Sequence, residues 1–276
     1  MGTLYVVATP IGNLEDISLR ALRVLKEVRL VAAEDTRATK RLLARYGIET
    51  PLTSYFEHNK LAKLDYVLAA AAEGDVAVVS EAGMPGLSDP GYELVVAAIA
   101  RGIAVVPVPG PSASITALAV SGLPTDQFVY LGFLPRRSAD RRRLLAEVAD
   151  EPRTLVAFEA PHRLLRGLED IAAELGNRRL AVARELTKVH EEILRGTVAE
   201  MLARFRAVAP RGEFTLVIEG CPRRARRATA EEAADRLAAL KREGLSGREA
   251  VARVADESGL PKREVYGLWL KLGEGD

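Results

Sequence analysis

Short apolar runs alternate with helical patterns along the first 115 residues. Four runs without charged residues predict buried strands at Thr3–Ala8, Leu30–Ala33, Val76–Val79 and Ile103–Val106. Apolar residues at helical spacing predict helices at 17–28, from Thr36 to near Gly47, at 61–72 and up to Arg101. Strands that alternate with helices in this way are typical of a largely parallel α/β sheet.

A second pattern of the same kind follows Gly122. Strands are predicted at 128–131, 154–158, 180–183, 192–195 and 214–219. We place the boundary between the two patterns in the stretch Pro111–Pro124, which separates the last strand of one from the first strand of the other. The sequence therefore predicts two α/β domains, 1–115 and 116–222.

The pattern changes again beyond Pro222. Three short helices and no strand are predicted, at 230–242, 247–257 and 262–270. They form a C-terminal helical domain over 223–276. Tyr266 and Trp269 on its last helix are expected to pack in the core, and base stacking is the alternative. The spacing of residues 244–270 resembles a helix-turn-helix unit, a fold that binds RNA or DNA.

The chain has 276 residues and one cysteine, Cys221, so no internal disulfide can form and a reducing compartment is expected. We see neither a signal peptide nor an apolar stretch of about 20 residues, so a soluble, cytoplasmic protein without membrane contact is expected. The three histidines lie far apart in the sequence, and no bound metal is expected.

The net charge is only +1, but the arginines are unevenly distributed. One group consists of Arg136, Arg137, Arg141, Arg142 and Arg143, and another of Arg223, Arg224, Arg226 and Arg227. Groups of this kind can bind phosphates on a nearly neutral protein. The first is equally compatible with a solvated helix face and the second with a linker, so the residues alone leave both interpretations open.

Four loops follow predicted strands, at the edge where α/β sheets bind their ligands. These loops are rich in glycine, proline and acidic residues, and they cover 9–16, 34–37, 80–91 and 107–113. None has the GxGxxG or GxxxxGK[ST] signature of a nucleotide site, and no GxSxG elbow of a serine hydrolase is present. Glycine and proline allow close backbone approach to a ligand, so the four loops together predict a binding cleft.

Seven segments of the chain, in order, resemble the ribosomal RNA small subunit methyltransferase I family. They are Ala8–Leu14, Ala33–Arg37, Ser88–Gly91, Pro109–Ser112, Gly132–Pro135, Pro161–Leu164 and Ala183–Lys188. The similarity runs to about Gly220 and extends to the helical tail. Three positions depart from the family pattern: Glu81 replaces an aspartate, Met84 a threonine and Ala160 a serine.

The resemblance implies two α/β domains of the tetrapyrrole methylase fold with the cofactor, S-adenosylmethionine, in the cleft between them. It also implies a homodimer that transfers a methyl group to the ribose 2′-oxygen of a cytidine in the decoding region of 16S rRNA, in the small ribosomal subunit. From the family's loops we expect cofactor contacts at Pro10, Glu81, Ala82, Gly83, Met84, Ser112, Ala113, Phe158, Ala183 and Thr215.

A ribose hydroxyl is a poor nucleophile, so a proton acceptor would assist the transfer. The candidates are Asp35, His58, Glu185 and Lys188. Residues expected to hold RNA phosphates are Arg37, Arg136, Arg137, Arg141, Arg142 and Arg143. A surface ion pair or a helix cap explains each of these residues as well, and the sequence does not choose.

Two other functions remain open from the sequence. The fold would allow methylation of a small tetrapyrrole, but such a substrate requires neither the basic stretches nor the helical tail. A non-catalytic RNA-binding module is the other alternative, and cofactor binding would separate it from an enzyme.

Overall fold

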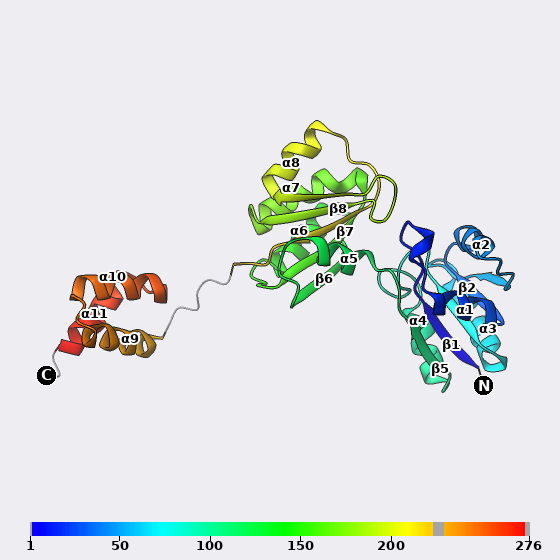
Figure 1. Cartoon of the computed structure of the whole chain (residues 1–276), viewed down its shortest axis with the longest axis horizontal. Coiled ribbons are helices and arrows are strands. Elements are labelled where there is room, and N and C mark those ends of the chain that lie inside the picture. The colour runs from blue at the N-terminus through cyan, green and yellow to red at the C-terminus, as the bar shows by residue number, and fades with distance from the viewer. Residues whose placement is uncertain (1, 223–228, 274–276) are drawn as a thin grey trace. The chain divides into compact units, whose positions relative to one another are not determined.

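The computed structural model describes residues 2–222 and 229–273 and divides the chain into two compact units, Met1–Gly220 and Cys221–Asp276 (Figure 1). The first unit contains two five-stranded sheets, and the described part of the second contains helices only. The second arginine group, at 223–227, lies outside the described residues.

The first sheet has the strand order β3-β2-β4-β1-β5, and all its pairs are parallel. Its strands are β1 (Thr3–Val7), β2 (Leu30–Ala33), β3 (Leu52–Ser54), β4 (Val76–Val79) and β5 (Ala104–Val108). Four of the five were predicted, and the parallel arrangement is confirmed. The edge strand β3 was missed because its three residues, Leu-Thr-Ser, form no apolar run.

Helices cover both faces of this sheet. They are α1 (Leu19–Glu27), α2 (Thr36–Arg45), α3 (Lys60–Glu73) and α4 (Tyr92–Ala100), with a short 3-10 turn at Leu14–Asp16. Because successive strand residues point to opposite faces, Val7 and Val31 pack with α1 and α2, whereas Leu4 and Ala32 pack with α3 and α4. This packing holds the carboxyl ends of the parallel strands, and the loops that follow them, at one edge.

Helix α5 (Ala113–Val120) contains the expected domain boundary at 115. Its Ala117 and Leu118 pack with Val156 and Val217 of the second sheet. Helix α5 therefore packs on the second sheet, and the boundary at 115 stays a prediction.

The second sheet has the order β6-β7-β10-β8-β9. Its strands are β6 (Phe128–Phe133), β7 (Thr154–Glu159), β8 (Arg179–Arg184), β9 (Glu192–Thr197) and β10 (Phe214–Ile218). Only β6 and β7 are parallel, so the expectation of a second largely parallel sheet is wrong. One reason is local: β8 and β9 are joined by residues 185–191 without a crossover helix, and such a connection pairs strands antiparallel. The other is that β10 lies between β7 and β8 and is antiparallel to both.

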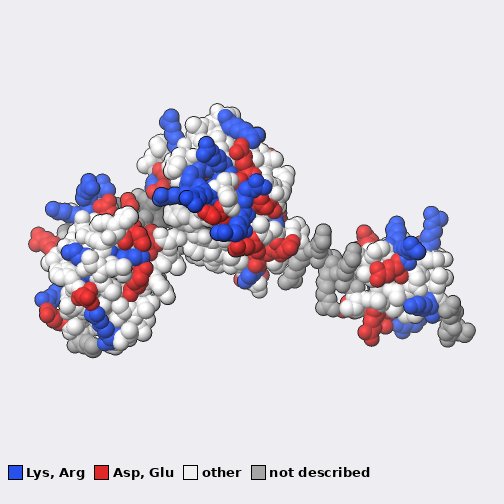
Figure 2. All heavy atoms as spheres, turned by 180° about the vertical axis from the view of Figure 1, so that it is seen from behind, with Lys and Arg blue, Asp and Glu red and all other residues white. Residues whose placement is uncertain are grey.

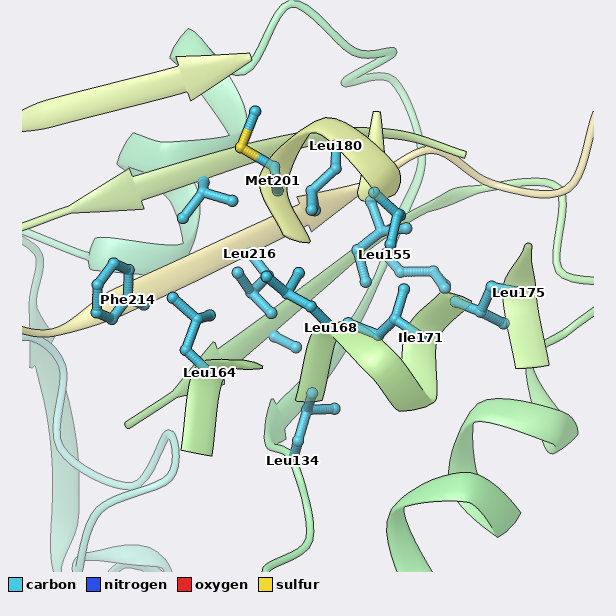
Figure 3. Packing of buried hydrophobic residues seen from close by; sticks show 14 of the residues in the cluster. Leu134, Leu155, Leu164, Leu168, Ile171, Leu175, Leu180, Met201, Phe214 and Leu216 are labelled. Carbon is cyan, nitrogen blue, oxygen red and sulfur yellow. The ribbon is translucent and has the colours of Figure 1, made fainter. Parts of the chain in front are cut away.

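Helices α6 (Ser138–Glu147), α7 (Leu164–Leu175) and α8 (Val198–Ala207), with a 3-10 turn at Pro161–Arg163, pack on the second sheet. Figure 3 shows Leu164, Leu168 and Ile171 pointing from α7 toward Leu155 and Leu216 of the sheet. Each leucine buried in this way stabilises the fold by about 1.5–3 kcal/mol relative to an exposed one.

The C-terminal unit consists of α9 (Ala230–Arg242), α10 (Gly247–Ser258) and α11 (Lys262–Gly273) (Figure 1). Reciprocal capping boxes begin α9 at Thr229 and α10 at Ser246. Trp269 packs against the apolar core of this unit as expected, but Tyr266 is 53% exposed, so its predicted core position is wrong. No helix in the described part of the chain is both long and apolar enough to cross a bilayer.

Candidate active site

The loop after β1 and the loop after β4 are joined by two backbone hydrogen bonds. The Thr9 N–H donates to the Gly83 carbonyl at 2.9 Å, and the Gly83 N–H donates to the Thr9 carbonyl at 3.0 Å. The Ser80 hydroxyl also donates to the Gly83 carbonyl, at 3.2 Å. The predicted cofactor residues Pro10 and Glu81–Met84 are therefore brought together.

Gly83 has a φ of +84°, a conformation that side-chain-bearing residues rarely adopt. A Cβ at this position would lie 3.6 Å from Ile11 Cγ2 and 3.8 Å from the Pro111 carbonyl oxygen. The loop after β5, which leads to the predicted residues Ser112 and Ala113, thus approaches the same point.

Acidic side chains gather at this edge of the sheet. The Glu34 carboxylate accepts the Glu81 N–H at 3.1 Å, and burial raises the pKa of Glu34. Burial and the nearby charges of Glu34 and Glu81 raise the pKa of Asp89 to about 7, although a hydrogen bond from Ser80 acts in the opposite direction. Asp89 was not among the expected site residues, because neither its burial nor these neighbours can be read from the loop sequence.

Asp35 has a structural task at the start of α2. Its Oδ1 accepts the N–H groups of Arg37 at 2.7 Å and Ala38 at 3.1 Å, so this residue, and not Thr36, caps the helix. The two backbone hydrogen bonds lower the pKa of Asp35, which makes it a weak proton acceptor. The Arg37 side chain is exposed beside it.

Three predicted cofactor residues of the second sheet form one row. Thr215 of β10 lies opposite Phe158 of β7 and also opposite Ala183 of β8. Residues opposite each other across a strand pair point to the same face. Ala183 and Thr215 are buried, while the Phe158 ring packs on Tyr130 at 5.6 Å and Phe133 at 5.3 Å between centroids.

The loops of the first sheet contact the second sheet directly. Ile11 packs in one apolar cluster with Ala183 and Val217. The Asn13 N–H donates to Thr187 Oγ1 at 3.0 Å, and the Ser88 and Tyr130 hydroxyls are 2.7 Å apart. The predicted cofactor residues of both sheets are thus parts of one connected region.

Lys188 lies in this contact as an ion-paired residue. Its Nζ is 3.0 Å from Glu185 Oε1 and 2.8 Å from Glu213 Oε2. Burial acts to lower the pKa of Lys188, but the two carboxylates outweigh it and raise that pKa. A Cβ on Gly12 would lie 2.5 Å from Lys188 Cγ, so the lysine stem packs on the loop after β1. Of the remaining candidate acceptors, His58 is exposed, with its ring 6.3 Å from that of Phe56.

A buried carboxylate holds the loop after β7. Glu159 is 1% exposed; its Oε1 accepts the Ala160 N–H at 2.8 Å and pairs with Arg163 at 2.7 Å. Arg163 in turn donates to the Leu134 carbonyl at 3.0 Å. These contacts fix the carboxyl ends of β6 and β7 next to Phe158.

The first arginine group is not uniform. Arg141 is 2% exposed and its guanidinium is bound by Asp170 and by the carbonyl oxygens of Pro135 and Arg136. The expectation that Arg141 binds phosphate is therefore corrected, because its hydrogen bonds are directed into the protein. Arg136 and Arg137 are exposed, whereas Arg142 and Arg143 are exposed but paired with Glu174 and Asp140. Figure 2 shows such mixed blue and red surface on this part of the molecule.

No set of three or more potential metal ligands gathers in the described ranges. The residues present instead suit an organic cation, which binds to carboxylates and apolar rings. The first sheet contributes the carboxylates of Glu34, Glu81 and Asp89, and the second contributes the apolar ring of Phe158. Backbone groups of the Gly83 loop lie at the same edge.

Comparison with known proteins agrees with this geometry. Residues 3–202 match the family of tetrapyrrole (corrin/porphyrin) methylases. The solved structure of the methyltransferase CobJ superposes with a TM-score of 0.62 at 20% identity, covering 80% of this chain and 95% of that one. The fold and the two sheets are therefore those of the tetrapyrrole methylases, methyltransferases whose methyl donor is S-adenosylmethionine.

Closer relatives define the family within this fold. Ribosomal RNA small subunit methyltransferase I of Synechocystis is 48% identical over 99% of this chain and 99% of its own length. The enzyme of the same name from Halalkalibacterium halodurans is 47% identical over 97% of this chain and 94% of its own. The chain belongs to the ribosomal RNA small subunit methyltransferase I family, as its motifs indicated, and it is a methyltransferase.

Proposed function

We propose that the chain transfers the methyl group of S-adenosylmethionine to the ribose 2′-oxygen of a cytidine in the decoding region of 16S rRNA, within the small ribosomal subunit. One observation carries this proposal. The chain is 47–48% identical in sequence, over 97–99% of its length, to relatives named ribosomal RNA small subunit methyltransferase I. Because small ribosomal subunits are made in the cytoplasm, we expect the enzyme to act there.

The cofactor site would comprise both sheets. Pro10 and Glu81–Met84 would supply backbone groups from the loops of the first sheet, and Ser112 and Ala113 from the start of α5. The row Phe158, Thr215 and Ala183 would supply the wall from the second sheet. The bound cofactor supplies an activated sulfonium methyl group, so in-line positioning accounts for much of the rate. The nearby carboxylates of Glu34 and Glu81 favour a cationic ligand.

Asp89 is the side chain at this edge best suited to accept the ribose proton. Its pKa of about 7 lies close to that of an efficient general base at neutral pH. Asp35 caps α2, and Lys188 remains protonated between two carboxylates. When bound, the cofactor would give up its methyl group by cleavage of the sulfur–methyl bond and would leave as the neutral thioether S-adenosylhomocysteine. Asp89 would accept the proton that the 2′-hydroxyl loses on methylation.

The RNA would be held by exposed arginines that position its backbone. We retain Arg37, Arg136, Arg137, Arg142 and Arg143 in this set and leave out Arg141. The helical unit and the arginines at 223–227 would add contacts of their own. Binding through phosphates weakens as salt rises, because counterions are released when the protein binds.

A homodimer is part of the proposal, and α4 offers a face for it. Tyr92, Val96 and Ile99 are spaced as one helical stripe and are 68%, 47% and 63% exposed. Leu61 of α3 is 71% exposed. Exposed apolar groups in such a stripe mark interaction surfaces more often than isolated ones do.

The test is methyl transfer from labelled S-adenosylmethionine to purified small subunits, followed by mapping of the labelled nucleotide. The expected product carries one ribose methyl group on a decoding-region cytidine. A label on a base, on protein or on a tetrapyrrole in place of the ribose would overturn the proposal.

A further inference from the structure

Helices α10 and α11 of the C-terminal unit enclose a groove of about 520 Å³. Small-molecule sites in proteins commonly have volumes of about 300–1,000 Å³, so the groove is large enough for one nucleotide. Its walls are Arg248, Val251, Lys262, Tyr266, Trp269 and Leu270.

The aromatic wall is held by a close contact. A Cβ on Gly247 would lie 2.6 Å from Trp269 Nε1 and 2.8 Å from its Cε2, so the indole lies directly against the backbone at the start of α10. Trp269 also packs on the core of the unit. Tyr266, one turn earlier on α11, is 53% exposed at the same groove. The groove thus has one fixed ring and one accessible ring.

The charge of the groove has one sign. Arg248 and Lys262 belong to its lining, and no aspartate or glutamate does. Two carboxylates of α10 are engaged elsewhere: Glu249 closes the capping box with Ser246, and Glu257 pairs with Arg236 and Arg253. A ligand with an apolar ring and a negative charge fits this combination.

We propose that this groove binds one unpaired nucleotide of ribosomal RNA, with its base against Tyr266 and Trp269 and its phosphates at Arg248 and Lys262. The inference rests on the proposed function, since it assigns part of the same RNA substrate to the helical unit. Aromatic side chains that stack bases beside cationic groups are the usual means of binding single-stranded nucleic acid.

Trp269 is the only tryptophan of the chain, so the intrinsic indole fluorescence of the full-length protein reports on this groove alone. Titration with a short unpaired oligoribonucleotide should quench that fluorescence to a plateau. A duplex of the same sequence should not, because its bases are already stacked on one another. Tyr266→Ala should weaken binding about tenfold, the loss expected for one stacked base. The double change Arg248→Ala and Lys262→Ala should also weaken binding about tenfold, because it removes both phosphate contacts.

Two matched variants serve as controls. Tyr66→Ala removes a tyrosine of similar exposure, 54%, from α3, and Arg253→Ala removes a cation of α10 that is absent from the groove lining. Both should bind the oligonucleotide like the unchanged protein. Anisotropy of a labelled oligonucleotide measures total binding in parallel with the quenching.

Methylation of small subunits separates this inference from the proposed function. If the unchanged protein methylates subunits and Tyr266→Ala raises KM without lowering kcat, both proposals are supported. If the unchanged protein methylates them while anisotropy shows tight RNA binding with no indole quenching, and Tyr266→Ala leaves KM unaltered, the groove is not an RNA site. A protein that shows quenching by RNA but no methyl transfer would overturn the proposed function alone.

Discussion

The two sheets of the first unit contribute different chemistry to one region. The first is wholly parallel, so its loops converge at one edge and bring Glu34, Glu81 and Asp89 together. The second is mostly antiparallel and presents a row of side chains, Phe158, Thr215 and Ala183, across neighbouring strands. Strand direction thus decides whether a sheet offers converging loops or a flat wall, and the proposed site would use both.

The helices that cover the two sheets also differ in the side chains that they expose. On the first sheet, α4 exposes Tyr92, Val96 and Ile99. On the second, α6 and α7 are joined by Arg142–Glu174 and by the buried pair Arg141–Asp170. We therefore expect a protein partner at the helices of the first sheet, and solvent or RNA phosphates at those of the second.

The largest effect is expected at Asp89. Asp89→Asn should lower kcat by about 10²- to 10⁴-fold, the usual contribution of a general base, with cofactor affinity nearly unchanged. Since the carboxylate acts only when ionised, kcat of the unchanged enzyme should rise as the pH rises through about 7 and then level off. Single-turnover rates at several pH values measure the loss in kcat and the pH midpoint.

Asp35→Ala is the control. It removes a helix cap, so it should cost about 0.5–2 kcal/mol of stability but leave the pH midpoint of kcat unchanged.

The raised pKa of Asp89 also leads to a prediction about the stability of the folded protein. The folded pKa, about 7, exceeds the value of 3.8 for an unperturbed aspartate, so the folded protein holds a proton that the unfolded chain releases. Stability attributable to Asp89 should therefore fall as the pH rises from about 4 to 7. Denaturant unfolding of Asp89→Asn should show a smaller fall over that window; an identical pH profile would contradict the assigned pKa.

The next largest effect separates two neighbouring arginines. Arg141→Ala leaves Asp170 without its buried partner and should destabilise the protein by about 3–5 kcal/mol. Arg143, whose side chain is 73% exposed, should tolerate alanine within about 0.5 kcal/mol. The triple change Arg136→Ala, Arg137→Ala and Arg143→Ala, however, should weaken binding to small subunits and make that binding less dependent on salt. Equal stability of the Arg141 and Arg143 variants would disprove the assignment of Arg141 to the interior.

A smaller effect is expected at Gly83. Gly83→Val should weaken cofactor binding about tenfold or more, because a side chain at positive φ strains the loop and blocks backbone approach. Gly102→Val is the matched control: φ is +70° there, and nothing lies within 4 Å of the added Cβ. Calorimetric titration with S-adenosylmethionine should distinguish the two, and equal affinities would show that the Gly83 loop is only a turn.

The smallest effect on activity and stability is expected for substitutions at the proposed dimer face. Val96→Glu with Ile99→Glu should convert a dimer to a monomer in sedimentation at micromolar concentration, with little change in the unfolding midpoint of the chain. Val208→Glu, at a valine that is 63% exposed beyond α8, should remain dimeric. A monomeric unchanged protein would refute the proposed dimer itself.

Much of the architecture could be predicted because it depends on local pattern. Val76–Val79 and Ala230–Arg242 match the predicted bounds, since an uncharged apolar run and a capped amphipathic stretch each specify one element. The direction of β10 could not be predicted, because it pairs with β7 and β8, which are distant from it in the sequence. Asp89 and Arg141 show the same limit for function: the pKa of one and the burial of the other depend on partners remote in the sequence.

We propose that one S-adenosylmethionine molecule contacts both sheets. A crystal structure of the chain with S-adenosylmethionine tests it most directly. We expect backbone contacts from the Gly83 loop on one side of the cofactor and the Phe158, Thr215 and Ala183 row on the other, with the methyl group facing Asp89. A cofactor bound to only one of the two sheets, or bound away from both sets of residues, would contradict it.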